Sequence, residues 1–228
     1  MKAKPDYRKL RFTNMTSPQF SHLFYLLFWP IWGLLFSWLE GRDEIEYHVV
    51  ECELDGLIPF CEFFVIPYLF WFVFLAGMLV FGLLFDVETF RKMSQFIIVT
   101  YMATAVIYVV WPSQQLLRPE SFARDNVFTR FMAHFYAFDT NTNVCPSLHV
   151  IGSMAALFAG WNSRYFCKWP WRISFIVITI LICLSTVFLK QHSALDIFPA
   201  LVISFAAYYL VYKKMKKTQE QVQLEARL

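Results

Sequence analysis

The sequence predicts an all-α integral membrane protein that crosses the bilayer six times. Hydrophobic residues make up 58% of the 228 residues and aromatic residues 20%, whereas charged residues make up 16%. A soluble domain is typically about half apolar and about a quarter charged. Several apolar runs also approach or exceed the roughly 20 residues that a helix needs to cross about 30 Å of hydrocarbon. A chain of this length is expected to form a single domain, residues 1–228.

Six apolar segments are the predicted spans, and polar or charged residues separate them. The spans cover residues 20–39, 58–85, 93–111, 147–166, 172–189 and 193–212. The other segments are, in order, a basic N-terminal segment (1–18), an acidic loop (40–56), a turn (86–92), a polar connection (112–145), a short link (167–171) and a basic tail (213–228). The acidic loop holds eight carboxylates when Glu62 is counted. We interpret it as a solvated connection; the alternatives are a loop that gates access to the site or one that binds a partner.

Lysine and arginine residues are distributed unequally between the two sides of the predicted bundle. Six spans put both termini on one side, and that side carries fifteen of the twenty Lys and Arg residues. Because cytoplasmic segments are enriched in these residues, both termini are expected in the cytoplasm. The five on the other side are Arg42, Arg118, Arg124, Arg130 and Lys190. They indicate an anionic ligand there, although a long loop is also translocated regardless of its charge.

His192 and Asp196 are the pair that points most directly to chemistry. Their i,i+4 spacing puts both on one face of a helix, which Ser193 can cap. A carboxylate beside an imidazole fixes its tautomer and stabilises its protonated form, and the other ring nitrogen can then attack phosphorus. Ionisable groups at membrane boundaries are rare and indicate function. A histidine–aspartate contact at a helix end is, however, also a common structural cap.

A second group of candidates lies at the start of the fourth span, where residues 146–149 read Pro-Ser-Leu-His. Proline is favourable just before a helix, and Ser147 then presents its hydroxyl and free backbone N–H groups to an anion. His149 can act as a general acid for a leaving oxygen, which typically contributes about 10²–10⁴-fold. Each residue alone fits a plain N-cap or an interfacial histidine. Together with His192 and Asp196 on the same side, they predict a site.

Arg118, in the polar connection, is the third candidate. A guanidinium group binds phosphate oxygens bidentately and keeps its charge in any environment. The alternative is a solvated loop arginine. Arg124 and Arg130 fit that alternative better, because no recognisable pattern surrounds them.

These motifs resemble the three sequence blocks of the type 2 phosphatidic acid phosphatase superfamily. That family carries Lys-x6-Arg-Pro, Pro-Ser-Gly-His and Ser-Arg-x5-His-x3-Asp, in this order. Here the first block keeps Arg118 with its proline, and the second is the motif at 146–149. The third keeps Ser185, His192 and Asp196 at the family spacing. The blocks fall on spans three to six, so the resemblance covers nearly the whole chain.

The resemblance implies a reaction at the extracytoplasmic face that needs no metal ion or cofactor. In it His192, oriented by Asp196, attacks phosphorus and gives a phosphohistidine. His149 protonates the leaving alkoxide and later activates water. The implied phosphate ligands are Arg118, Ser147 and Ser185.

Three positions depart from the family pattern: Trp111 replaces the lysine, Thr186 the arginine and Leu148 the glycine. Two cations of the usual phosphate clamp are therefore missing. Lys190 can replace them only if the helix breaks before His192, because positions two apart on a continuous helix point about 200° apart. The Pro-Ser-Leu-His motif and the reduced clamp resemble the inositol phosphorylceramide synthase-like branch, which transfers phospho-headgroups between lipids.

The leading hypothesis is a membrane lipid phosphatase that hydrolyses a lipid phosphomonoester. The alternatives are transfer of a phospho-headgroup from a phospholipid diester to a lipid alcohol, and a non-catalytic membrane protein of the same fold. The expected partners are a membrane lipid substrate and the bilayer; no nucleic acid is expected, and the sequence does not indicate a protein partner. No metal is expected, because no cluster of potential ligands has metal-site spacing. Compactness and the lack of long loops indicate a bacterial cell membrane.

Overall fold

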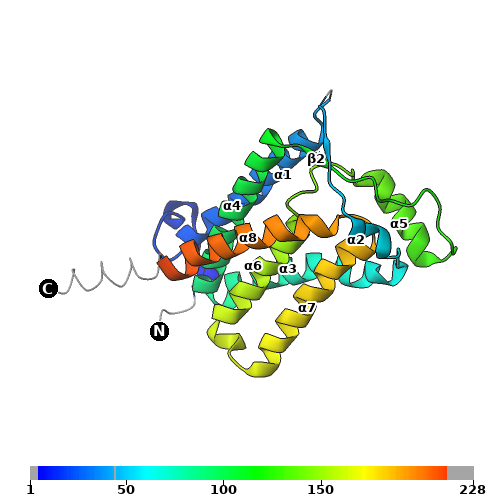
Figure 1. Ribbon diagram of the computed structural model, residues 1–228. Coiled ribbons are helices and arrows are strands. Elements are labelled where there is room, and N and C mark those ends of the chain that lie inside the picture. The colour runs from blue at the N-terminus through cyan, green and yellow to red at the C-terminus, as the bar shows by residue number, and fades with distance from the viewer. Residues whose placement is uncertain (1–4, 44, 215–228) are drawn as a thin grey trace.

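Helices dominate the structure and run between two ends of one bundle (Figure 1). The computed structural model describes residues 5–43 and 45–214. Its α-helices are α1 (Phe28–Glu40), α2 (Glu53–Leu57), α3 (Val65–Phe85), α4 (Val87–Val110), α5 (Val127–Phe138), α6 (Leu148–Asn162), α7 (Trp169–Phe188) and α8 (Ile197–Tyr208). Four shorter helical segments extend them: η3 (Ser21–Leu27) precedes α1, η4 (Glu62–Phe64) precedes α3, η6 (Ala194–Asp196) precedes α8, and η7 (Tyr209–Lys214) follows it. Two short strands, β1 (His48–Val49) and β2 (Ser113–Gln114), pair in parallel.

Five helical segments of the described chain are long and apolar enough to cross a membrane. They are Ser21–Glu40, Glu62–Phe85, Val87–Val110, Trp169–Phe188 and Ala194–Lys213. These segments agree with the predicted all-α membrane protein. The fourth predicted span, residues 147–166, corresponds to α6, which has only 15 residues. At a rise of about 1.5 Å per residue it is roughly 22 Å long, which is less than the hydrocarbon thickness, so six spans are not confirmed.

The largest errors in the predicted span starts are those of spans two and three. The second span was expected to start at residue 58, but the helical segment starts at Glu62. The third was expected to start at residue 93, whereas α4 already begins at Val87 because Asp86 caps it. The Asp86 carboxylate accepts hydrogen bonds from the backbone N–H and the hydroxyl of Thr89. A capping carboxylate satisfies free N–H groups at a helix start and favours the positive helix end, so the predicted turn 86–92 shrinks to one residue.

Helix α6 is the central helix of the bundle. It packs against α3, α4, α7 and α8, and ten of its fifteen residues are buried. Small residues make this close packing possible, as they do at many helix interfaces in membranes. Gly152 and Gly160 show it most clearly, because a Cβ atom there would lie within 2.8 Å of the Trp71 ring and 2.6 Å of the Phe175 ring, respectively.

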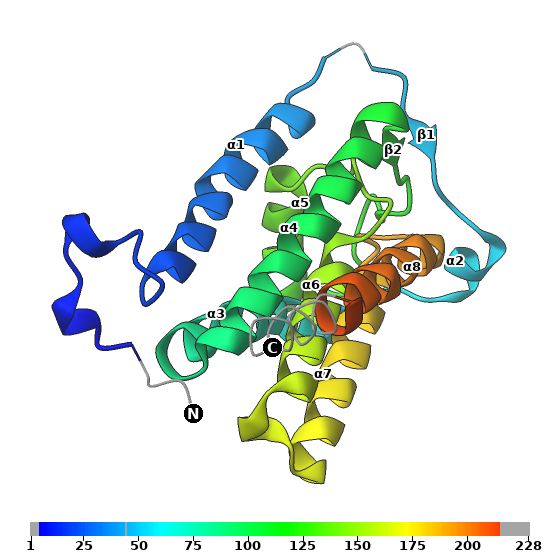
Figure 2. The ribbon, with the colours of Figure 1, turned by 90° about the vertical axis from the view of Figure 1, so that its left-hand side faces the viewer.

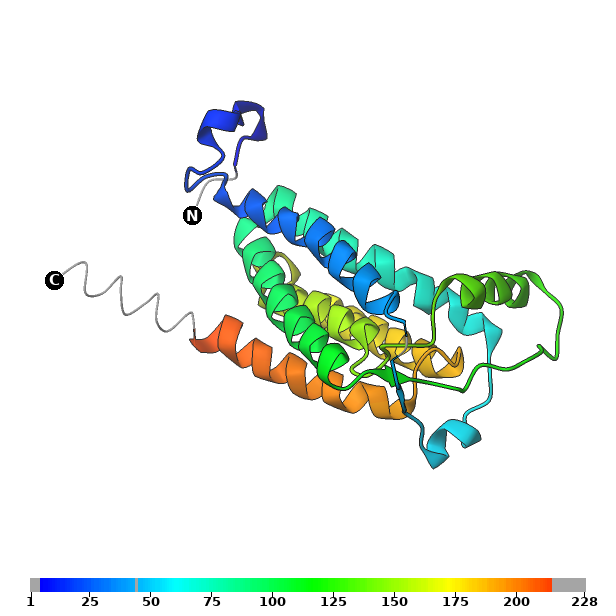
Figure 3. The same cartoon turned by 90° about the horizontal axis from the view of Figure 1, so that it is seen from above.

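The two ends of the bundle differ in what surrounds them. At one end, α3 and α6 begin and α4 and α7 finish; α2 and α5 project beyond this end, which we call the α2–α5 end (Figure 3). At the other end, the N-terminal segment contacts the α3–α4 turn: the Tyr7 hydroxyl donates to the Leu83 carbonyl. Helix α1 runs beside α4 at the edge of the bundle (Figure 2). The last described residues lie at the end opposite α2 and α5.

Replacement of Gly82 by alanine tests the approach of α3 to α4. A Cβ atom at Gly82 would lie 2.9 Å from the Phe90 backbone nitrogen, whereas nothing lies within 4 Å of a Cβ atom at Gly77 in the same helix. We expect Gly82→Ala to destabilise the protein by about 1–3 kcal/mol. Gly77→Ala should be neutral or stabilising, because alanine has the higher helix propensity. The thermal unfolding midpoints of the two variants are measured in the same detergent. Equal midpoints would contradict the close approach of α3 to α4 at Gly82.

Candidate active site

Two histidine rings and one carboxylate meet at the α2–α5 end, although separate helices supply them. His149 is the second residue of α6, whereas His192 and Asp196 lie in the turn and the short η6 between α7 and α8. The ring centroids of His149 and His192 are 5.6 Å apart. His192 Nδ1 lies 3.0 Å from Asp196 Oδ2. The three predicted catalytic residues are therefore adjacent.

A left-handed residue at the end of α7 creates the turn that carries His192. Lys190 has a φ angle of 53°. Its N–H donates to the Val187 carbonyl, and the Gln191 N–H donates to the Thr186 carbonyl. This is the Schellman pattern, in which glycine is usual because a side chain in the left-handed conformation costs roughly 1–2 kcal/mol. The helix thus breaks before His192, as the proposed role of Lys190 requires.

The Lys190 side chain nevertheless points toward α2 and not toward the histidines. Its Nζ donates to the carbonyl oxygens of Asp55 at 2.6 Å and Ile58 at 2.5 Å. Burial lowers the pKa of this ammonium group, and the nearby Asp55 carboxylate opposes that shift. In this arrangement Lys190 ties the turn to α2 and is not available as the phosphate ligand that we predicted from the sequence.

Asp196 holds the His192 ring in one orientation. The carboxylate is fully buried, and its Oδ2 accepts hydrogen bonds from His192 Nδ1 and, at 3.1 Å, from the Ser193 N–H. Because Nδ1 faces the carboxylate, Nε2 is the nitrogen left to meet a ligand. The same contacts form a capping box at the start of η6. The structural role and the chemical role that the sequence suggested are therefore compatible with each other.

Aromatic rings enclose His149, and its Nε2 atom has no hydrogen-bond partner. The Tyr68 and Trp71 ring centroids lie 4.6 Å and 4.5 Å from that of His149. The Ser147 hydroxyl and the Gln191 side-chain nitrogen are also buried without a partner. Such atoms are uncommon and costly in folded proteins. Of these three residues, His149 and Gln191 line one cavity, so their unpartnered nitrogens belong to the same site.

A cavity of about 70 Å³ lies in front of the two histidines. Its lining residues are Phe36, Glu40, Tyr108, Asp139, Thr140, Thr142, Asn143, Val144, Leu148, His149, Gln191 and His192. Two carboxylates are among them. Glu40 accepts a hydrogen bond from Asn143 Nδ2 at 2.6 Å. Burial raises the pKa of Asp139, while Arg118 and His192 oppose that shift.

Arg118 lies beside this cavity, but protein groups already occupy most of its donors. Nη1 donates to the carbonyl oxygens of Tyr136 and Asp139, and Nη2 donates to the Thr140 carbonyl and to Gln191 Oε1 at 2.6 Å. Only Nε is buried without a partner. Burial lowers the pKa of the guanidinium group, and the Asp139 carboxylate opposes the shift. Arg118 thus joins the polar connection to the His192 turn through Gln191.

The remaining predicted residues, Ser147 and Ser185, are not among those that line the cavity. The Ser185 hydroxyl is buried within α7 and donates to the Ile182 carbonyl at 2.6 Å. Ser147 occupies the N-cap position of α6 without a side-chain cap bond. Its N–H donates to the Asp196 carbonyl at 3.3 Å, which connects the two halves of the site. Trp111, which replaces the lysine of the first family block, stacks on His48 with a distance of 5.1 Å between the ring centroids.

Our interpretation of the acidic loop was wrong for two of its carboxylates. Asp55 is 2% exposed and Glu62 is 6% exposed. Sequence reasoning also missed Gln191, Glu40 and Asp139 as lining residues. Nothing in the sequence distinguishes the two carboxylates from their solvated neighbours, whereas Gln191 could have been suspected from its position next to His192.

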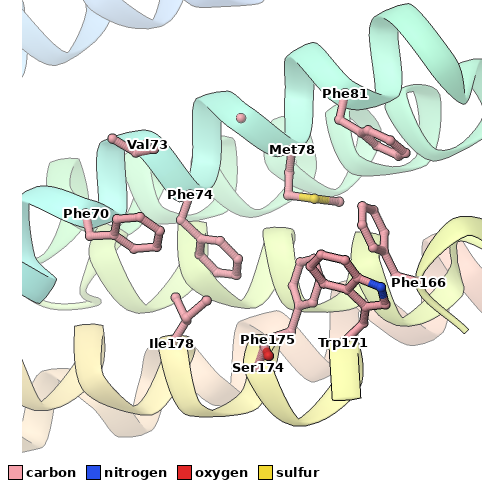
Figure 4. Close-up of a pocket in the computed structure, with 11 residues that line it drawn as sticks. Phe70, Val73, Phe74, Met78, Phe81, Phe166, Trp171, Ser174, Phe175 and Ile178 are labelled. Carbon is pink, nitrogen blue, oxygen red and sulfur yellow. The ribbon is translucent and has the colours of Figure 1, made fainter. Parts of the chain in front are cut away.

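A larger hollow of about 260 Å³ lies between α3 and α7, away from the histidines. Figure 4 shows its walls, where Phe70, Phe74, Met78 and Phe81 of α3 face Phe175 and Ile178 of α7. Ser174 is its one polar lining residue, and no titratable side chain lines it. Of these two cavities, only the smaller one is lined by titratable side chains.

Comparison with protein families, curated proteins and solved structures finds no match for this chain. The resemblance to the phosphatase superfamily therefore rests on the sequence blocks alone. Within the described residues, no group of three or more His, Cys, Asp and Glu side chains is arranged to hold a metal ion.

Two replacements of Lys190 separate its backbone conformation from its hydrogen bonds to α2. Lys190→Gly and Lys190→Met both lose the bonds to Asp55 and Ile58, but only glycine relieves the left-handed backbone. We expect both variants to be less stable than the parent. We also expect the free energy of unfolding of the glycine variant to be about 1 kcal/mol higher than that of the methionine variant. Thermal unfolding in detergent measures the difference, and a methionine variant of equal or greater stability would contradict it.

Proposed function

We propose that this protein is a membrane lipid phosphatase that hydrolyses a lipid phosphomonoester through a phosphohistidine at His192. The observation that carries the proposal is the pairing of His192 with the buried Asp196 at 3.0 Å, with the His149 ring centroid 5.6 Å from that of His192. A nucleophile, the group that orients it and a second proton carrier are the parts that such a reaction requires.

The reaction has two steps. In the first, His192 Nε2 attacks phosphorus, the bond from phosphorus to the lipid oxygen breaks, and protonated His149 gives its proton to the leaving alkoxide. In the second, His149 takes a proton from water, the water oxygen attacks phosphorus, and the phosphorus–nitrogen bond breaks to release phosphate. Asp196 stabilises the positive charge that His192 carries while it is bound to phosphorus.

The proposal also covers placement in the membrane. We propose that α6 completes a six-span bundle, that both termini are cytoplasmic and that the cavity opens to the extracytoplasmic side of a bacterial cell membrane. The unequal distribution of Lys and Arg supports this orientation. Part of that count, including Lys216, Lys217 and Arg227 of the tail, lies outside the described residues.

A second candidate function is transfer of a phospho-headgroup from a phospholipid diester to a lipid alcohol. The observation that favours it is the charge around the cavity. Glu40 and Asp139 line the cavity, whereas Lys190 and most of Arg118 are engaged by protein oxygens. Nearby carboxylates repel a dianionic monoester more strongly than a monoanionic diester.

Replacement of His192 by alanine tests catalysis through this residue. Purified protein in mixed micelles with phosphatidate should release phosphate, and His192→Ala should lower the rate by about 10³-fold or more, because the nucleophile is lost. His134→Ala is the matched control, since His134 is exposed on α5 and lies outside the cavity lining. Headgroup transfer to ceramide or diacylglycerol without phosphate release would support the second candidate. A His192→Ala variant that matches the parent in both assays would rule out catalysis through His192.

Metal chelation gives an independent test of the proposed chemistry. A histidine nucleophile assisted by a second histidine needs no divalent ion. We therefore expect EDTA at millimolar concentration to leave phosphate release unchanged. A loss of activity that added Mg²⁺ or Zn²⁺ restores would contradict this mechanism.

A further inference from the structure

The segment between α1 and α3 forms hydrogen bonds with the turn that carries His192 and with the end of α7. The Cys61 N–H donates to the Phe188 carbonyl at 3.1 Å. Lys190 reaches back to two carbonyl oxygens in this segment. The third contact is the Asp55 carboxylate of α2. The segment therefore touches the turn before, at and after its left-handed residue.

The Asp55 carboxylate makes the contacts nearest to His192. Its Oδ2 accepts hydrogen bonds from the Ser193 hydroxyl at 2.5 Å and from the Cys52 N–H at 2.9 Å, and its Oδ1 accepts from the Ala194 N–H at 2.8 Å. Burial raises the pKa of Asp55, but the hydrogen bonds from Ala194, Ser193 and Cys52 outweigh it, so the net pKa lies below the ordinary value. Asp55 is therefore a buried anion whose partners come largely from the His192 turn.

We infer that Asp55 is a positioning residue for the His192–Asp196 pair, an inference that rests on the proposed function. Ser193 connects the two carboxylates: its hydroxyl donates to Asp55, while its N–H donates to Asp196 Oδ2. Asp55 also lies at the start of η6, where a negative charge is favoured. With Ser193 and Ala194 held from α2, the Asp196 carboxylate stays in line with His192 Nδ1. Asp55 itself is absent from the cavity lining, so it acts through the turn.

Asp86 provides a matched comparison at the other end of the bundle. Its carboxylate also accepts hydrogen bonds from a helix start and from a distant serine, namely Thr89 of α4 and Ser163, whose hydroxyl lies 2.9 Å away. Both carboxylates thus hold two separate chain segments together. Only Asp55 does so beside His192. Asp55→Asn and Asp86→Asn therefore each replace a carboxylate that accepts hydrogen bonds from two chain segments, but only the first replacement lies beside His192.

The first measurement is steady-state phosphate release by full-length protein in mixed micelles. We expect Asp55→Asn to lower kcat by about 10²-fold, the loss typical of a misplaced reacting group, with KM changed less than about threefold because the cavity walls are intact. Asp86→Asn should keep kcat close to that of the parent. Asp55→Glu should restore part of kcat, because it keeps the charge. Equal kcat in Asp55→Asn and the parent would overturn the inference.

The second measurement needs no substrate. Histidine-selective ¹⁵N NMR in detergent, with His192 assigned from the His192→Gln variant, reports which ring nitrogen carries the proton. The parent and Asp86→Asn should hold the proton of neutral His192 on Nδ1, whereas Asp55→Asn should show a mixture with the Nε2 tautomer. An unchanged tautomer in Asp55→Asn would overturn the positioning role. If the parent releases no phosphate, the proposed function fails, while the tautomer still decides the role of Asp55.

A second variant covers the case in which Asp55→Asn does not fold. Ser193→Ala removes the hydroxyl donor at 2.5 Å and keeps both carboxylates. We expect the same shift in tautomer and a fall in kcat of about tenfold. A parent-like tautomer together with a parent-like kcat in Ser193→Ala would overturn the inference.

Discussion

The hydrogen bond between Asp196 and His192 is the interaction on which the site depends. Asp196 is fully buried, and a buried carboxylate is costly unless hydrogen bonds or an opposite charge compensate for it. Its Oδ2 accepts hydrogen bonds from His192 Nδ1 and from the Ser193 N–H. These bonds hold the His192 ring with Nδ1 on the carboxylate, so that Nε2 is the nitrogen left for the attack on phosphorus that we propose.

The position of His149 follows from the central place of α6. Helix α6 has neighbours on four sides, and ten of its fifteen residues are buried. Its N-terminus lies at the α2–α5 end, next to the His192 turn. The Ser147 N–H to Asp196 carbonyl bond joins the two at the point where α6 begins. Close packing around α6 thus brings residues from two separate motifs to one cavity.

The two cations near the cavity, Arg118 and Lys190, form hydrogen bonds that hold the fold together. Arg118 ties the polar connection to the turn through Gln191, and Lys190 ties the turn to α2. Both cations would have to exchange protein oxygens for phosphate oxygens in order to bind a phosphate directly. The unpartnered atoms of His149, Ser147 and Gln191 are not subject to this competition. Under the proposed function, these neutral groups and the histidine rings would therefore contact the phosphate more readily than the two cations.

The sequence by itself determined the helical membrane class, because apolar runs of span length have no stable alternative in lipid. Local spacing also indicated that His192 lies next to Asp196, but the two do not share a helix face as predicted: His192 precedes the N-cap residue Ser193, and Asp196 is the last residue of η6. Tertiary structure decided the rest. The Lys190 side chain turns toward Asp55, 135 residues away, and Asp55 is buried although its neighbours in the loop are not. Such contacts depend on which surfaces meet after folding, and charge or spacing along the chain does not encode them locally.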